Sequence, residues 1–237
     1  MRELGVSEAY TRSRWLNDVR TVVGDSFLLF FRVLFETLEY PVFTVADIMN
    51  IESDAGVRYG LVKRAMRDGD LVQIKRGLYT LAVGLRKKPI NLHGLSNRMY
   101  YPSYVSLVSA LSFNGWIPEK VVSLTCVTSR NNAEFDTPLG RFTFARIPQK
   151  LFFCGVELTG DGSDTWLQAR PLKALADYVY IHKFDWTTRE PPVESLRIED
   201  KQLESISSDD FDNIQGNYHT AANVEAFLAG LRKDLQV

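Results

Sequence analysis

The sequence is poor in the residues that build metal centres and covalent cross-links. It holds two cysteines, Cys126 and Cys154, and three histidines among 237 residues. The cysteines lie in apolar segments without a Cys-x-x-Cys pattern, which favours buried free thiols in a reducing compartment over a disulfide. His93, His182 and His219 are scattered, with no i,i+4 pair and no carboxylate at ligand spacing. We therefore expect neither a metal site nor a cofactor.

Long apolar runs and the common enzyme motifs are also missing. No run approaches the roughly 20 apolar residues that a membrane-spanning helix needs, and Met1-Arg2-Glu3 leads into polar residues, not an apolar signal segment. Neither a Gly-x-x-x-x-Gly-Lys phosphate loop nor a Gly-x-Ser-x-Gly elbow is found, and GDGSD at 160–164 is typical of a polar turn between strands. These absences predict a cytoplasmic protein that is not an enzyme and does not contact a membrane.

Residues 41–81 have the element order of a winged helix-turn-helix. Thr44 opens a short helix that ends near Asn50, and Asp47 completes a capping-box-like pattern with Thr44. After a brief break, Ser53 is the expected N-cap of a second helix that runs to about Asp68, with Gly69 as its C-terminal cap. Two helices joined by about three residues match the spacing of a helix-turn-helix.

The second of these helices has two different faces. At 100° per residue one face is apolar, and it comprises Val57, Leu61, Val62, Ala65 and Met66. The opposite face comprises Gly56, Tyr59, Gly60, Lys63 and Arg67, with Arg64 at its margin. Arg58 lies closer to the apolar side, near the helix start, where recognition helices meet base edges. The glycines would let the helix backbone come near a groove wall, although a solvated basic face explains the same pattern.

A basic hairpin follows this helix. Two short apolar runs, Leu71–Ile74 and Leu78–Leu81, flank the three-residue loop Lys75-Arg76-Gly77. From Ala55 to Lys88 the chain holds nine Lys or Arg against two Asp. A basic helix followed by a basic hairpin favours phosphate contacts. We therefore predict DNA binding through nine residues: Thr44, Ser53, Arg58, Tyr59, Lys63, Arg64, Arg67, Lys75 and Arg76.

Charge is segregated along the chain, although the net charge is only −1. From Arg189 onward there are ten acidic and five basic residues, so this end repels phosphate. We expect an α/β (α+β) fold with two domains, a winged domain over residues 1–88 and a mixed α/β domain over residues 89–237. Upstream of the winged unit, Asp25–Tyr40 predicts a core helix. Ser7–Val23 has helical spacing that suits a packed helix, a DNA-reaching arm or a dimer contact.

The second domain shows alternating helix and strand patterns. The expected elements are a buried helix over Pro102–Phe113 stopped by Gly115, a strand over Val121–Thr128, two strands within Glu134–Ile147 around the turn at 137–140, a strand over Lys150–Leu158, and helices over 171–183 and 220–234. The acidic, Ser-rich segment at 190–217 supports no assignment.

Within this half a family resemblance becomes specific. Tyr100–Glu119, YYPSYVSLVSALSFNGWIPE, resembles the Y-[IV]-S-x-x-S-A-L-x-x-x-G-x-I-P-E stretch of the AbiEi family of transcriptional-regulator antitoxins. The similarity continues through Thr125–Thr128, Phe135–Pro148 (FDTPLGRFTFARIP) and Leu151–Phe153, and Gly77-Leu78-Tyr79 is similar to that family's wing. It spans roughly residues 40–155. Pro102 and Ser103 depart from the family's extended run, and residues before 40 or after about Asp185 carry no transferred role.

The resemblance implies a type IV antitoxin. Its winged domain would bind inverted repeats in the promoter of its own operon and repress it. Its second domain would counteract a nucleotidyltransferase-like toxin without requiring a stable complex. Two other classes remain open: a winged-helix regulator that senses a small ligand, which a compact apolar pocket would favour, and a nucleic-acid-processing enzyme, which perturbed carboxylates beside the basic helix would favour.

Overall fold

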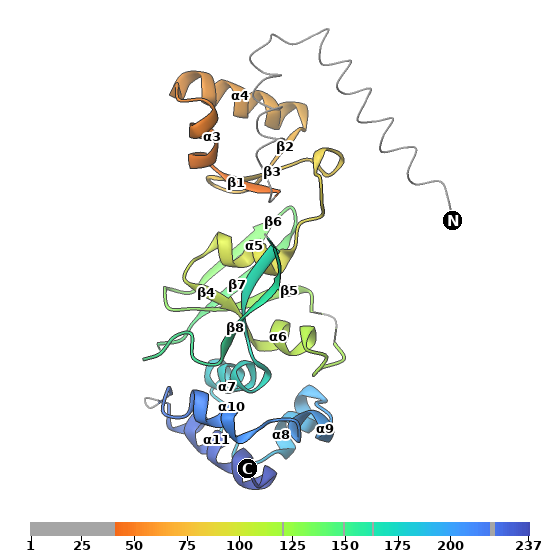
Figure 1. Ribbon diagram of the computed structural model, residues 1–237, viewed down its shortest axis with the longest axis vertical. Helices are drawn as coiled ribbons and strands as arrows, with labels where there is room; N and C mark the ends of the chain where they lie inside the picture. The colour runs from red at the N-terminus through yellow and green to blue at the C-terminus, as the bar shows by residue number, and fades with distance from the viewer. Residues whose placement is uncertain (1–40, 120, 149, 163, 219–220) are drawn as a thin grey trace, which may run out of the picture. The chain divides into compact units, whose positions relative to one another are not determined.

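In the computed structural model, residues 41–119, 121–148, 150–162, 164–218 and 221–237 are described. The helices expected over Ser7–Val23 and Asp25–Tyr40 lie outside these residues. The chain divides into two compact units after Asn91, whereas the sequence placed the domain boundary after Lys88. Helices and sheets occur together, so the expectation of a mixed α/β fold is confirmed (Figure 1). No helix in the described segments is long and apolar enough to cross a membrane.

The first unit packs two helices on a small sheet. Its described elements are β1 (Val42–Thr44), α3 (Val45–Ile51), α4 (Ala55–Asp68), β2 (Leu71–Lys75), β3 (Leu78–Leu81) and the 3-10 turn η1 (Val83–Leu85). The sheet order is β1-β3-β2, with both pairs antiparallel. The prediction of a two-stranded ribbon was thus incomplete, because Val42–Thr44 adds a third strand beside β3. Three residues flanked by Pro41 and a helix cap are too few to show a strand period.

A compact core joins the helices to this sheet. Its buried members are Phe43, Ile48, Ala65, Leu71 and Leu81, and partly buried residues such as Leu61, Val62 and Tyr79 pack around them. The apolar face expected for α4 is narrower than predicted, because Val57 is 47% exposed and Met66 39% exposed. Of that face, Leu61, Val62 and Ala65 belong to the core formed by the described residues.

The second unit is built on a six-stranded mixed sheet. It contains β4 (Ser103–Val105), β5 (Ser123–Thr128), β6 (Ala133–Thr137), β7 (Gly140–Arg146), β8 (Val156–Asp161) and β9 (Asp164–Ala169), in the order β6-β7-β5-β4-β9-β8. The β5–β7 and β4–β9 pairs are parallel, and the other three are antiparallel. The hairpin around residues 137–140 and the polar turn between strands at 160–164 are as predicted.

The second unit also contains helices, which pack on the sheet and on one another. They are α5 (Leu92–Met99), α6 (Leu107–Phe113), α7 (Pro171–His182), α8 (Glu190–Leu196), α9 (Asp200–Leu203), α10 (Ser208–Ile214) and α11 (Ala222–Leu235). Helix α6 packs against β5 and α7, while α10 and α11 pack on α7. Figure 1 shows α7 between the sheet and the blue C-terminal helices.

Three predictions for this unit were wrong or incomplete. The helix over Pro102–Phe113 begins only at Leu107, since Ser103–Val105 forms strand β4 between β5 and β9. The strand over Lys150–Leu158 begins only at Val156, because residues 152–155 form a turn. The segment at 190–217, left unassigned, holds three short helices, and α5 was not foreseen. Strand β9 was implied only as the strand that follows the polar turn, without bounds.

A buried network of charged and polar side chains connects α7 to β4 and to Tyr218. The buried Lys173 ammonium lies 3.1 Å from the buried Asp177 carboxylate and donates to the Tyr218 hydroxyl at 2.7 Å. Tyr104 and Ser106, at the end of β4, donate to the other oxygen of Asp177 at 3.0 and 2.7 Å. Burial lowers the pKa of Lys173, and the Asp177 charge opposes that shift. Removing either partner would leave the other ion buried and uncompensated.

Candidate nucleic-acid interface

The turn between α3 and α4 is held by a set of local hydrogen bonds. Thr44 caps α3, and the reciprocal bonds of a capping box with Asp47 are both present, as predicted. The N-cap of α4 is Asp54, not Ser53: the Asp54 carboxylate accepts the Val57 N–H at 2.8 Å. Both residue types cap well, so the sequence alone left a one-residue ambiguity. Ser53 lies exposed in the turn itself.

Arg58 lies near the start of α4, and its side chain bonds back to this turn. Its guanidinium donates to the carbonyl oxygens of Glu52 and Ser53 at 2.9 and 3.1 Å. These carbonyls lie past the end of α3, so Arg58 ties the second helix to the first. A role for Arg58 in contacting base edges would require these bonds to be exchanged for bonds to the base.

The outer face of α4 is the stripe expected from helical spacing. Gly56, Tyr59, Gly60, Lys63 and Arg67 are all exposed, and Tyr59 is exposed by 69%. The Lys63 ammonium lies 5.8 Å from the centre of the Tyr59 ring. Neither glycine has a left-handed backbone, and a Cβ placed on Gly60 would meet no atom of the described residues within 4 Å. The packing of the described part of this unit therefore gives no reason for glycine at position 60.

The C-terminal end of α4 carries a shared carboxylate. Asp68 lies 2.9 Å from the Arg67 guanidinium and 3.6 Å from that of Arg64. The hydrogen bond from Arg67 lowers the pKa of Asp68, so this carboxylate is ionised at neutral pH. Because these pairs are solvent-exposed, they contribute little stability, and a phosphate can compete for either arginine. Gly69 ends the helix with φ of 82°, as predicted for a C-terminal cap.

The hairpin turn is tighter than expected. Lys75 is still paired with Leu78, so the loop contains two residues, Arg76 and Gly77, and Gly77 has φ of 80°. The Gly77 carbonyl accepts the Val45 N–H at 3.2 Å, and Thr44 lies opposite Leu78 in the sheet. The turn is therefore fastened to the start of α3. Arg76 is exposed at this turn.

The nine predicted residues thus fall into three groups. Thr44, Lys75 and Arg76 surround the hairpin turn and the start of α3. Ser53 lies in the turn between the helices, and Arg58, from the start of α4, bonds to that turn. Tyr59, Lys63, Arg64 and Arg67 lie further along α4. Asp54 is the residue of structural importance that the sequence interpretation missed.

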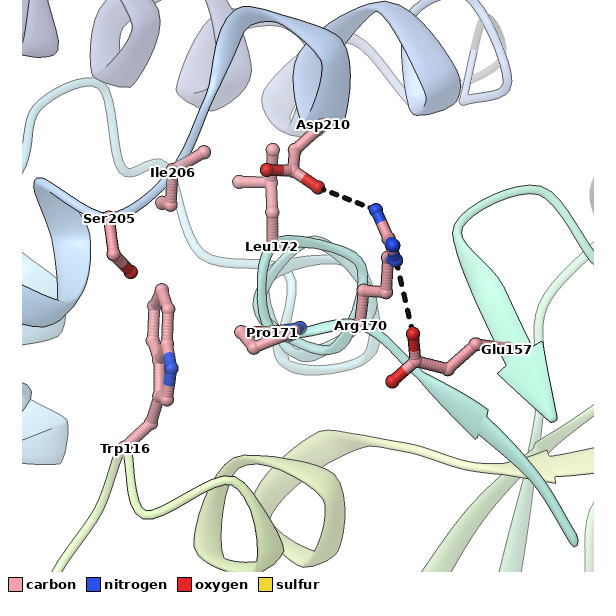
Figure 2. A pocket seen from close by; sticks show the side chains of 8 residues that line it. All are labelled: Trp116, Glu157, Arg170, Pro171, Leu172, Ser205, Ile206 and Asp210. Carbon is pink, nitrogen blue, oxygen red and sulfur yellow. Dashed lines mark hydrogen bonds and ion pairs between the residues drawn. The ribbon is translucent and has the colours of Figure 1, made fainter. Parts of the chain in front are cut away.

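The second unit contains a pocket of about 230 Å³ at the N-terminal end of α7 (Figure 2). Trp116, Pro171, Leu172 and Ile206 form its apolar side, and Ser205 adds a hydroxyl. On its polar side Arg170 bridges Glu157 at 3.2 Å and Asp210 at 3.1 Å. Among the described residues, no group of three or more His, Cys, Asp or Glu could hold a metal ion.

A scan against protein-family models and a search of curated proteins give no match to this chain.

Proposed function

We propose that this protein is a DNA-binding transcriptional regulator that represses its own operon and acts as the antitoxin of a type IV toxin–antitoxin system. The observation that supports DNA binding best is the exposed face of α4, with two glycines beside Tyr59, Lys63 and Arg67. A helix that projects cations and lacks side chains at two positions can approach a major groove closely. The first unit would then act as a winged helix-turn-helix.

In this proposal the two parts of the first unit have different tasks. Tyr59 and Lys63 face base edges from the middle of α4, while Arg64 and Arg67 contact phosphates after leaving Asp68. Arg76, presented by the hairpin turn, contacts a further phosphate. Phosphate contacts set affinity and orientation, whereas contacts with base edges set specificity.

Sequence readout is tested at Tyr59. Replacing it with Ala removes the largest exposed side chain of the α4 stripe but no core contact. We expect the ratio of affinities for the operon's own upstream DNA and for unrelated DNA to fall, with little change in thermal stability. Electrophoretic titration of both DNAs measures this ratio. If discrimination is unchanged, base reading lies outside the middle of α4.

The antitoxin role is supported by the resemblance of residues 40–155 to the AbiEi family, and the partner it implies is a nucleotidyltransferase-like toxin encoded nearby. Co-expression with the neighbouring toxin gene tests this role. We expect the full chain to protect cells, and a fragment from Pro89 onward to protect them without binding promoter DNA. If only proteins that bind promoter DNA protect the cells, both activities belong to the first unit.

A ligand-sensing regulator is the second candidate, and the pocket beside α7 is the observation that favours it. Its volume of about 230 Å³ is below the roughly 300–1,000 Å³ of pockets that hold drug-sized ligands. Its charged groups are also already paired with one another. The pocket could therefore accept only a small guest, and we rank this function second. A metabolite that shifts the melting temperature of the wild type but not of Arg170→Leu would reverse the ranking.

A further inference from the structure

A second cationic surface lies on the other unit, at the end of β5 and β7. It consists of Tyr100, Tyr101, Arg130, Asn131, Asn132 and Arg146, and we call it the arginine–tyrosine surface. All of these residues are exposed except Tyr100, which is half-buried. Thr128 and Arg146 are neighbours in the parallel β5–β7 pair, so the loop after β5 and the end of β7 lie together.

Hydrogen bonds and ring contacts connect the residues of this surface. The Arg130 guanidinium stacks over the Tyr100 ring at 4.6 Å and donates to the Tyr101 carbonyl at 3.4 Å. The Tyr100 hydroxyl donates to the Asn131 carbonyl at 3.1 Å, and the Arg146 N–H donates to the Asn132 side chain at 2.7 Å. Tyr100 also packs on Phe144. These contacts fix the Tyr100 ring, the Arg130 guanidinium and the loop after β5 relative to one another.

The charges of this surface are not neutralised from within the unit. Arg130 and Arg146 form no ion pair with any other described residue, whereas nearby Glu134 and Asp136 are both paired with Arg141. Residues 92–237 hold 14 Lys and Arg against 18 Asp and Glu. Two arginines without a described ion-pair partner, at the ends of adjacent strands of an acidic unit, indicate an anionic partner.

The aromatic rings narrow the class of partner. Tyr101 is 64% exposed, and the adjacent Tyr100 ring is already covered by a guanidinium. An acidic peptide would use the arginines but leave Tyr101 without a partner. Unpaired nucleotides supply both a phosphate and a base face that can stack on an aromatic ring, and duplexes hide those faces. Two asparagine side chains add hydrogen-bonding groups for base edges.

We propose that the arginine–tyrosine surface binds single-stranded nucleic acid, with Arg130 and Arg146 on phosphates and Tyr101 against a base. This activity is separate from duplex binding by the first unit and does not depend on it. The shared chemistry of RNA and DNA strands explains the contacts equally, so the test includes both.

The test uses the full chain and fluorescein-labelled strands about a dozen nucleotides long: oligouridylate, oligodeoxythymidylate and a duplex of the same length. Fluorescence anisotropy at several salt concentrations gives the affinity and its salt dependence. We expect both single strands to bind. The strand that binds more tightly shows whether RNA or DNA is the preferred partner. Arg130→Gln and Arg146→Gln should each weaken binding and reduce the salt slope by about 0.7.

Matched variants separate this surface from general charge effects. Arg141→Gln removes the same charge from the other end of β7, where the arginine is already paired, and should leave binding unchanged. Tyr101→Leu should weaken binding roughly 5- to 150-fold at an unaltered salt slope, whereas Tyr101→Phe, which keeps the ring, should bind like the wild type. Lys63→Gln on α4 should weaken duplex binding but not single-strand binding. Melting curves confirm that each variant is folded.

The proposal is wrong if neither single strand binds at low salt, or if Arg141→Gln weakens single-strand binding as much as Arg130→Gln does. It is also wrong if, of these variants, Lys63→Gln alone weakens single-strand binding, or if polyglutamate displaces the labelled strand as well as an unlabelled strand does.

Discussion

Replacing Gly60 with Ala should make the first unit more stable and the proposed DNA complex weaker. Gly60 lies inside α4, where glycine is about 1 kcal/mol less favourable than alanine. A Cβ at this position meets no atom of the described residues within 4 Å, so the added methyl group clashes with none of them. We expect stabilisation of up to about 1 kcal/mol, which raises the melting temperature of a small domain by roughly 4–8 °C.

The same methyl group projects from the face that we assign to DNA. Inserting a methylene group into a closely packed contact costs about 1–3 kcal/mol, which corresponds to a roughly 5- to 150-fold weaker affinity. Stability and affinity should therefore change in opposite directions, which loss of folding cannot imitate. Gly56 is less suitable for this test, because its Cβ would lie 3.3 Å from the Asp54 carboxylate that caps the helix.

Thermal unfolding and anisotropy titration of upstream DNA measure the two effects on the same preparation. Gly84→Ala is the matched control: it adds one methyl group to the same unit, where a Cβ also meets no atom of the described residues within 4 Å, but it lies in η1 and not in α4. We expect it to leave DNA affinity unchanged. If Gly60→Ala raises the melting temperature while DNA affinity stays at the wild-type value, the α4 face does not contact DNA closely and this reasoning is wrong.

Other perturbations test the structure around these surfaces. Asp54→Ala should lower the free energy of unfolding by about 1 kcal/mol in urea titrations, because Asp54 is the N-cap of α4, whereas an equal loss for Ser53→Ala would contradict that assignment. Burial raises the pKa of the Cys126 thiol to about 12, so an alkylating reagent at about pH 8 should leave Cys126 unmodified until the protein unfolds, and rapid native labelling would refute its burial. Burial lowers the pKa of His93, which packs on Phe113 and Trp166, so the His93 imidazole binds a proton more readily in the unfolded chain than in the folded protein. The contribution of neutral His93 to the free energy of unfolding is therefore complete above the ordinary pKa and decreases as the pH drops below about 6.5. When the pH is lowered from about 7.5 to about 5.5, the urea midpoint should fall less for His93→Leu than for the wild type.

The sequence predicted best where a local rule acts alone. The Thr44–Asp47 capping box, Gly69 as a helix cap and the exposed stripe of α4 each depend on residues within one or two turns. Long periodic segments such as α7 were found for the same reason.

Predictions failed where a tertiary contact decides the outcome. Ser103–Val105 has a sequence compatible with the following helix, but it becomes a strand because β5 and β9 offer hydrogen bonds on both sides. Val42–Thr44 joins β3 in the same way. In the candidate interface, helical spacing could not reveal that Arg58 would bond to the carbonyls of Glu52 and Ser53, because that depends on how the chain turns between the helices.

The central claim is that the first unit binds duplex DNA through phosphate contacts that include the hairpin turn. Salt-dependent titration of the operon's upstream duplex with wild type, Arg76→Gln and Arg141→Gln tests it most directly. The account predicts that Arg76→Gln weakens binding and reduces the salt slope by about 0.9, while Arg141→Gln, with the same loss of charge, behaves like wild type. An unchanged slope for Arg76→Gln, or equal effects of the two variants, would contradict it.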